Sequence, residues 1–198
     1  MDVEGIPYVH PSYNHIEFLV GGKLNIALVE QIANQKQVVL KIINDKSDFD
    51  RERKFLSILG KSPASDFVVE LKDTLEPSHG EPRYGLVEEL LGENLSDYLR
   101  KRPILEELDR KNLAVSVLNA IAAIHSRRVV HGDLKPYQIC FDPKQRGFKV
   151  KLVDFDSAFS LDDKSHRLDR FTLLYAAPEV PIRVALTSFI RSIFLFSL

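Results

Sequence analysis

A few charged side chains in this chain have the types and spacing needed for chemistry on a phosphate group. Asp133 and Lys135 lie close together, and Asp154 directly follows an apolar stretch. One carboxylate can orient a hydroxyl and accept its proton, and a second can bind a divalent cation. Lys41 lies among branched apolar residues, where a lysine is costly to bury unless anions compensate its charge. These are the groups that phosphoryl transfer needs from a protein.

Three motifs carry most of these residues, and they follow one another along the chain. They are His-Gly-Asp-Leu-Lys-Pro-Tyr-Gln at 131–138, Asp-Phe-Asp at 154–156 and Thr-Leu-Leu-Tyr-Ala-Ala-Pro-Glu at 172–179. In this order they resemble the catalytic loop, the metal-binding loop and the end of the activation segment of eukaryotic protein kinases. Lys135 and Thr172 match the serine/threonine branch of that family, so the resemblance implies serine/threonine specificity.

The resemblance implies roles for four residues in the second half of the chain. Asp133 would accept the proton of the substrate hydroxyl, and Lys135 would contact the transferred phosphate. Asp154 would bind the magnesium ion, and Gln138 stands where the family has a metal-binding asparagine. The implied cofactors are ATP and Mg²⁺, and the implied substrate is a hydroxyl group of a protein.

The same resemblance places the nucleotide against the first half of the chain. Lys41 stands where the family has a strand lysine that pairs with the phosphates, and Glu52 is the best candidate for its carboxylate partner. Residues 88–91 resemble the hinge that binds adenine through its backbone. The residues expected to bind ATP are Gly21, Gly22, Lys41, Glu52, Glu89 and Leu91.

Hydrophobic periodicity predicts the elements that must position these residues. The first half reads as a small antiparallel β lobe with one helix, and helices dominate the second half. Strands are expected at 16–20, 25–33, 38–43, 68–75 and 84–90, and helices at 48–60, 95–102 and from an Asp109 cap to about 126.

The resemblance implies an α+β fold of the protein-kinase type with two lobes, the second of them incomplete and mainly helical. The expected parts are an N-terminal extension at 1–15, an N-lobe at 16–91, a partial C-lobe at 92–182 and an apolar tail at 183–198.

Several positions depart from the family pattern. The adjacent glycines at 21–22 replace a glycine-rich loop whose amides close over the phosphates. Gln138 replaces asparagine, and Gly132 replaces an arginine that would pair with a phosphorylated loop. Asp156 replaces a glycine and tolerates left-handed backbone less well. Glu88 falls where an apolar residue usually guards the back of the pocket, and a carboxylate there is costly to bury unpaired.

These departures leave two other interpretations open. One is a catalytically impaired pseudokinase that works by binding other proteins. The other is a small-molecule phosphotransferase of the aminoglycoside or choline kinase type, which the motifs at 131–133 and 154–156 also resemble. Lys135 and the segment 172–179 favour a protein substrate over a small molecule.

Composition narrows the classes of partner. A formal net charge of −1 gives no reason to expect attraction to nucleic acid or to anionic membranes. The single cysteine, Cys140, cannot form an intrachain disulfide and suits an intracellular, cytoplasmic protein. The apolar run at 184–198 is interrupted by Arg191 and is shorter than the ~18–20 residues of a spanning helix, so we expect no membrane span. We expect a protein as substrate or partner.

Overall fold

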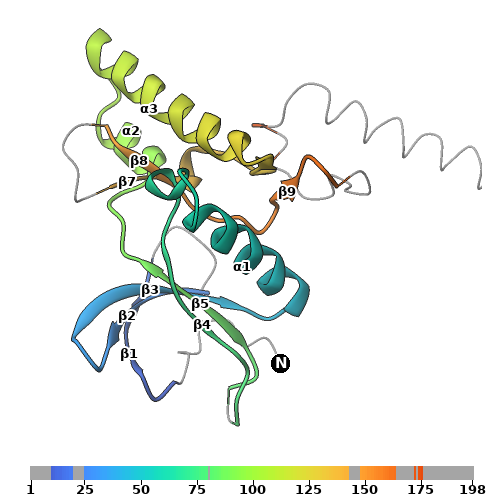
Figure 1. Ribbon diagram of the computed structural model, residues 1–198. Coiled ribbons are helices and arrows are strands. Elements are labelled where there is room, and N and C mark those ends of the chain that lie inside the picture. The colour runs from blue at the N-terminus through green and yellow to red at the C-terminus, as the bar shows by residue number, and fades with distance from the viewer. Residues whose placement is uncertain are drawn as a thin grey trace, which may run out of the picture.

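The computed structural model describes residues 10–19, 25–79, 81–142, 148–163, 172 and 174–175. A five-stranded sheet with one helix against it forms the first lobe, and two helices with short strand pairs form the second (Figure 1). This arrangement confirms the predicted α+β fold with a small antiparallel β lobe. The glycines at 21–22, the Ala-Pro-Glu end of the third motif and the tail at 183–198 lie outside the described residues.

The sheet of the first lobe has the order β1-β2-β3-β5-β4, and each neighbouring pair is antiparallel. Its strands are β1 Tyr13–Phe18, β2 Ile26–Gln31, β3 Lys36–Ile43, β4 Leu71–Leu75 and β5 Tyr84–Glu89. Along β3, Val38, Leu40 and Ile42 point into a cluster of buried residues on one face of the sheet. Because side chains alternate along a strand, Lys41 points to the other face.

The strands β1 and β4 start three residues away from their predicted starts, and the other strand ends differ by at most two residues. The strand β1 begins at Tyr13, before the predicted start, and pairs from there with β2. The segment predicted to begin β4 at Val68 instead contacts the second lobe, because Val69 donates its amide hydrogen to the carbonyl of Leu152 at 2.9 Å. The strand β4 therefore starts only at Leu71.

The helix α1, Lys46–Gly60, covers the face of the sheet to which Lys41 points. Asp45 caps it by accepting hydrogen bonds from the amides of Ser47 and Asp48, so the helix starts two residues before the predicted boundary. Its buried residues fall on one face and are Phe49, Glu52, Phe55, Leu56 and Leu59. All but Glu52 are apolar.

The second lobe contains α2, Leu95–Lys101, and α3, Glu107–Ser126. The predicted cap at Asp109 is wrong: this residue lies in the first turn, and Glu106 occupies the N-cap position without a side-chain cap bond. Two short antiparallel pairs follow, together with the short 3₁₀ helices η1 and η2. The remaining elements are η1 Ser65–Phe67, β6 Val129–Val130, η2 Pro136–Gln138, β7 Ile139–Phe141, β8 Val150–Leu152 and β9 Phe159–Ser160.

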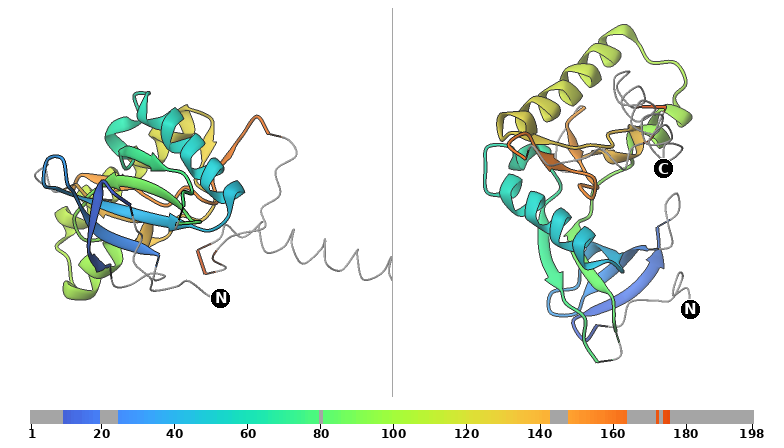
Figure 2. Two further views of the ribbon diagram at one scale, coloured as in Figure 1. Left: turned by 90° about the horizontal axis from the view of Figure 1, so that it is seen from below. Right: turned by 90° about the vertical axis from the view of Figure 1, so that its right-hand side faces the viewer.

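One hydrophobic core joins the two lobes. Phe49 and Leu56 of α1 belong to the same buried cluster as Ile124 of α3 and Leu152 of β8. Figure 1 and Figure 2 both show α1 between the sheet and α3. Within the described part of the chain, none of the helices combines the length and the apolar content that crossing a bilayer requires.

Candidate active site

A buried ion pair joins β3 to α1. The Nζ atom of Lys41 donates to Oε1 of Glu52 at 2.9 Å, and both side chains are nearly or fully buried. The same Glu52 oxygen accepts the amide hydrogen of Phe155 at 3.0 Å. Burial by itself would lower the pKa of Lys41, but the carboxylates of Glu52 and Asp154 outweigh it and raise that pKa. The ammonium therefore stays charged, as a partner for phosphate must.

Asp154 completes this cluster from the segment that follows β8. Its Oδ1 contacts Nζ of Lys41, and its Oδ2 accepts a hydrogen bond from Nε2 of Gln138 at 3.2 Å. Burial favours the neutral acid, but the ammonium of Lys41 outweighs it and holds the pKa of Asp154 at about 2. The structure thus brings together four predicted site residues, from β3, α1, η2 and the segment after β8.

The backbone around Asp154 differs from the expectation. The need for left-handed backbone was predicted at Asp156, whereas the positive φ, 68°, falls on Asp154 itself. Asp156 is held by other contacts: its carbonyl accepts from Nη1 of Arg51 at 3.1 Å, and its carboxylate accepts from the hydroxyl of Ser157 at 2.9 Å. Asp can adopt the left-handed region because its short polar side chain makes local hydrogen bonds.

A second cluster surrounds Asp133. Lys135 donates from Nζ to Oδ2 of Asp133 at 2.7 Å and to the hydroxyl of Thr172 at 3.0 Å. The amide of Thr172 donates to Oδ1 of Asp133 at 2.6 Å. Burial opposes ionisation of this carboxyl, but the bonds from Lys135 and Thr172 outweigh it and lower its pKa. Asp133 is therefore an ionised, oriented acceptor, as a group that orients a hydroxyl must be.

The loop that carries Asp133 is held from behind by His131. This side chain is buried, its Nε2 lies 2.8 Å from the carbonyl oxygen of Val153, and its ring lies 4.8 Å from that of Phe155. Burial lowers the pKa of His131. The backbone adds a further tie, because the amide of Val153 donates to the carbonyl of Gln138 at 3.0 Å. The motifs at 131–138 and 154–156 are thus fixed to each other.

Gly132 fits this loop for a reason that the sequence did not reveal. Its φ is +86°, and a Cβ atom there would lie 2.2 Å from the carbonyl oxygen of Ser157. In this arrangement the backbone at 156–158 leaves no room for the arginine that the family has at this position.

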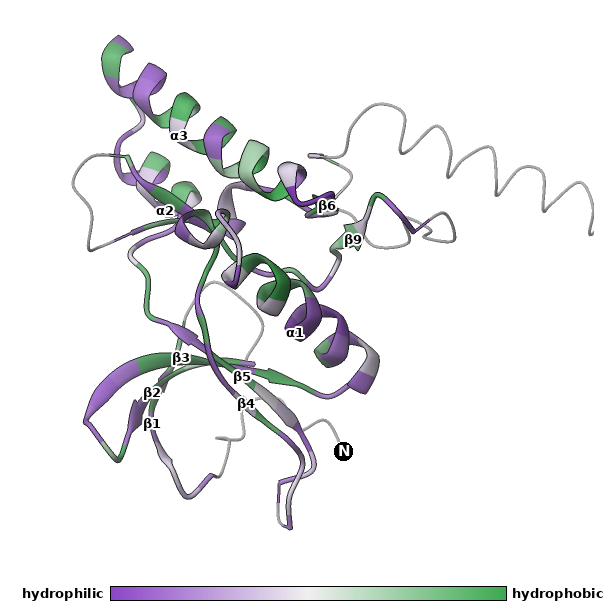
Figure 3. Cartoon of the chain, viewed as in Figure 1, coloured by the Kyte–Doolittle hydropathy of each residue, from purple (hydrophilic) through white to green (hydrophobic). Residues whose placement is uncertain are grey.

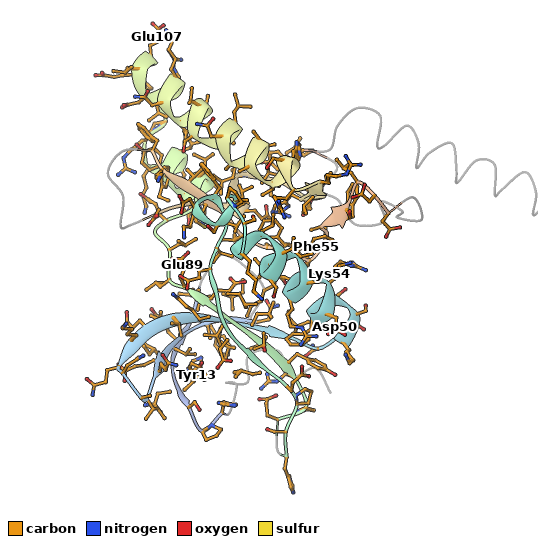
Figure 4. All side chains as sticks on the ribbon, in the orientation of Figure 1. Tyr13, Asp50, Lys54, Phe55, Glu89 and Glu107 are labelled. Carbon is orange, nitrogen blue, oxygen red and sulfur yellow. The ribbon has the colours of Figure 1, made fainter. Side chains whose placement is uncertain are left out.

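The residues predicted at the hinge lie where β5 leads into the second lobe, as Figure 4 shows for Glu89. The carboxylate of Glu89 accepts from the amide of Glu70 at 3.0 Å and contacts Nζ of Lys151. Leu91 packs, partly buried, against the shared core. The Lys151 contact was missed, although a lysine between Val150 and Leu152 gives the same signal as Lys41 between branched apolar residues. The side chain of Glu89 therefore braces the connection between the lobes.

Comparison with known proteins agrees with this geometry. The protein kinase domain model matches residues 21–188. The chain belongs to the protein kinase family. This kinase chain is 28% identical over 189 residues to the carbon catabolite-derepressing protein kinase of Candida tropicalis, covering 88% of this chain and 29% of that protein. It is 31% identical over 160 residues to a cGMP-dependent protein kinase of Eimeria tenella, covering 78% and 15% respectively.

A third relative is MAP kinase-interacting serine/threonine-protein kinase 1 of Xenopus laevis, 28% identical over 128 residues. That alignment covers 63% of this kinase chain and 30% of the relative. The chain therefore spans less than a third of the length of each of these three kinases.

The donor atoms of this kinase domain fit a magnesium ion. The Oε1 atom of Gln138 is buried without a hydrogen-bond partner, and the side chain of Asp154 is 36% exposed. Among the described residues no three carboxylate, imidazole or thiol side chains meet as a metal cage. Mg²⁺ is commonly held by one or two carboxylates together with phosphates and waters, so Asp154 and Gln138 would be a sufficient protein share of its ligands.

Proposed function

We propose that this kinase domain binds ATP with Mg²⁺ and transfers the γ-phosphoryl group to a serine or threonine hydroxyl of a protein. The observation that carries the proposal is the meeting of Lys41, Glu52 and Asp154. The buried ammonium of Lys41 would bind a phosphate group, and the partly exposed carboxylate of Asp154 would bind Mg²⁺. The buried carboxylate of Glu52 would hold the ammonium in place. The cluster of Asp133, Lys135 and Thr172 supplies the acceptor side.

Each group has a defined task in this reaction. Lys41 neutralises phosphate oxygens, and Glu52 keeps the ammonium in place. Asp154 and Gln138 would hold Mg²⁺, which neutralises charge on the phosphates when bound. Asp133 orients the attacking hydroxyl and accepts its proton as the oxygen bonds to phosphorus and the bond to the leaving ADP breaks. Lys135 offsets charge on the transferred group.

Calorimetry with ATP and Mg²⁺ tests the nucleotide half of the proposal. We expect saturable heat with the wild type and its loss in Lys41→Met and Asp154→Asn. Lys36→Met is the matched control, because Lys36 lies exposed on the same strand.

Phosphate transfer to a serine/threonine peptide tests the chemical half of the proposal, and we expect Asp133→Asn to abolish it. Unchanged transfer in Asp133→Asn would contradict the assigned role.

A specific observation favours a second candidate, a binding module without turnover. Lys41 and Gln138 already occupy both oxygens of Asp154, so the chain compensates this carboxylate with its own groups. In that case ATP binding, if it occurs, would not depend on Mg²⁺, and no peptide would be phosphorylated. An intracellular, cytoplasmic setting belongs to both candidates and is supported by the single cysteine.

A further inference from the structure

Glu88 of β5 is a buried carboxyl group that the catalytic machinery does not use. In the β3–β5 pair, Val39 lies opposite Glu88 and Lys41 lies opposite Leu86. Positions two residues apart share a face of the sheet, so Glu88 and Lys41 are diagonal neighbours on the face that α1 covers. Glu88 thus lies beside the cluster of Lys41, Glu52 and Asp154, on the same face of the sheet as Lys41.

One oxygen of the Glu88 carboxyl lacks a hydrogen-bond donor in the part of the chain that the structure describes. The residue is only 6% exposed, and its buried Oε1 has no hydrogen-bond partner among the described residues. The neighbouring ammonium of Lys41 donates to Glu52 and Asp154 instead. Leaving a buried acceptor unpaired is energetically costly, so this oxygen favours a ligand that brings a donor.

Only some groups of a nucleotide can donate a hydrogen bond to Glu88. Phosphates carry only acceptor oxygens and negative charge, so the ionised Glu88 carboxylate repels them toward Lys41. The donors of a nucleotide are its ribose hydroxyls and the amino group of its base. The cross-strand neighbours of Glu88 are Val39 and Leu71, an apolar wall that suits a flat base better than a ribose.

We propose that Glu88 accepts a hydrogen bond from the exocyclic amino group of the base and so selects ATP over nucleotides with an oxygen in its place. This inference rests on the proposed function, because it assumes that the phosphates lie at Lys41 and Asp154. A site built to pair with an amino group discriminates strongly against an analogue that lacks it, since its buried polar group then stays unpaired.

The charge state of Glu88 makes this selection dependent on pH. Burial, and then repulsion from Glu52, raise its pKa to about 8. The other groups that act on it are Lys41 of β3, Asp154 after β8 and Glu89 of β5, and it in turn acts on the thiol of Cys140 of β7. A neutral carboxyl can donate to an oxygen as well as accept from an amino group, whereas a carboxylate can only accept. The preference for ATP should therefore grow as pH rises through that pKa.

The test compares the affinities of ATP and inosine triphosphate, which carries an oxygen where adenine carries the amino group. Calorimetry with Mg²⁺ across that pKa, in wild type, Glu88→Gln and Glu70→Gln, gives the ratio of the two dissociation constants. We expect the wild-type preference for ATP to rise about tenfold with pH, a 1.4 kcal/mol difference. In Glu88→Gln the ratio should lose this rise with pH, because an amide does not titrate and can donate or accept.

The controls separate the possible failures. Glu70 is 54% exposed and pairs with Lys72, so Glu70→Gln removes a carboxylate from the same region and should behave as wild type. Any ionisation of the inosine base affects all three proteins equally. The inference is overturned if Glu88→Gln, shown by its thermal transition to be folded, keeps the wild-type ratio and pH dependence. Folded wild type that binds neither nucleotide would overturn the proposed function together with the inference.

Discussion

At the scale of single residues, Lys41 is the cation on which the candidate site depends. Its ammonium ties Glu52 of α1 to Asp154, so three separate segments meet at one nitrogen. Removing one partner of a buried ion pair leaves an uncompensated charge. The same side chain is therefore expected to matter for the stability of the domain and for its affinity for nucleotide.

Lys41→Met should lower the free energy of unfolding by about 3–5 kcal/mol, because Glu52 is left buried without its cation. In the double variant Lys41→Met/Glu52→Gln most of that loss should return, since a neutral amide still accepts from the amide of Phe155. Urea unfolding measures both, with Lys36→Met as the exposed control. Equal stability of the single and double variants would show that the loss does not come from the unpaired carboxylate of Glu52.

Glu88 should make stability fall as pH rises. Its folded-state pKa, about 8, lies above the ordinary value of 4.5, so the folded chain keeps a proton that the unfolded chain loses. Stability is then lost between about pH 4.5 and 8, and Glu88→Gln removes this loss. We expect Glu88→Gln to gain about 2 kcal/mol or more over wild type at pH 8 and little at pH 5, measured by urea unfolding. A gain that does not change with pH would contradict this account.

At the scale of elements, two glycines differ in whether their surroundings leave room for a side chain. Gly132 has a φ of +86° and faces the carbonyl of Ser157, whereas Gly60 ends α1 with no atom within 4 Å of a Cβ position. Gly132→Ala should destabilise the chain by about 2 kcal/mol or more. Gly60→Ala should be neutral or stabilise it by up to about 1 kcal/mol. Thermal unfolding of the two variants side by side checks both signs, and similar losses in both would refute the packing of Gly132 against 156–158.

Sequence reasoning predicted those elements whose pattern is local. The alternation around Lys41 and the helical period of α1 are visible without a structure, and the family resemblance indicated the pairing of Lys41 with Glu52. The start of β4 was wrong because Val69 bonds to Leu152, a contact that no local pattern encodes. Gly132 and the left-handed Asp154 were missed for the same reason, since their conformations depend on segments distant in sequence.

At the scale of the whole molecule, α3 has apolar residues along its length, as Figure 3 shows, and their exposure differs widely. Leu113, Ala120 and Ile124 lie in the shared core, whereas Val115 and Leu118 are 56% and 63% exposed. A surface helix normally keeps its outer face polar. We therefore expect the outward residues of α3 to contribute little to the stability of the described fold and to favour association.

Leu118→Lys should change the free energy of unfolding by less than about 0.5 kcal/mol, because this side chain is exposed. It should also raise the fraction of monomer seen by size-exclusion chromatography with light scattering. Ile124→Ala, in the core of the same helix, should cost about 2–5 kcal/mol in urea unfolding. A large loss in Leu118→Lys would mean that another part of the chain covers this face.

The labelling rate of the single thiol, Cys140, can report how often the native fold opens. Cys140 lies on β7 opposite Lys151, and burial raises the pKa of its sulfhydryl to about 12. Only the thiolate reacts with disulfide reagents. The native chain should therefore label slowly, and the unfolded chain should label fast. The labelling rate of Cys140 at rising urea should follow global unfolding. Fast labelling in buffer alone would show that β7 unfolds locally while the rest of the chain stays folded. No engineered cysteine is needed to follow the unfolding of the strands β7 and β8.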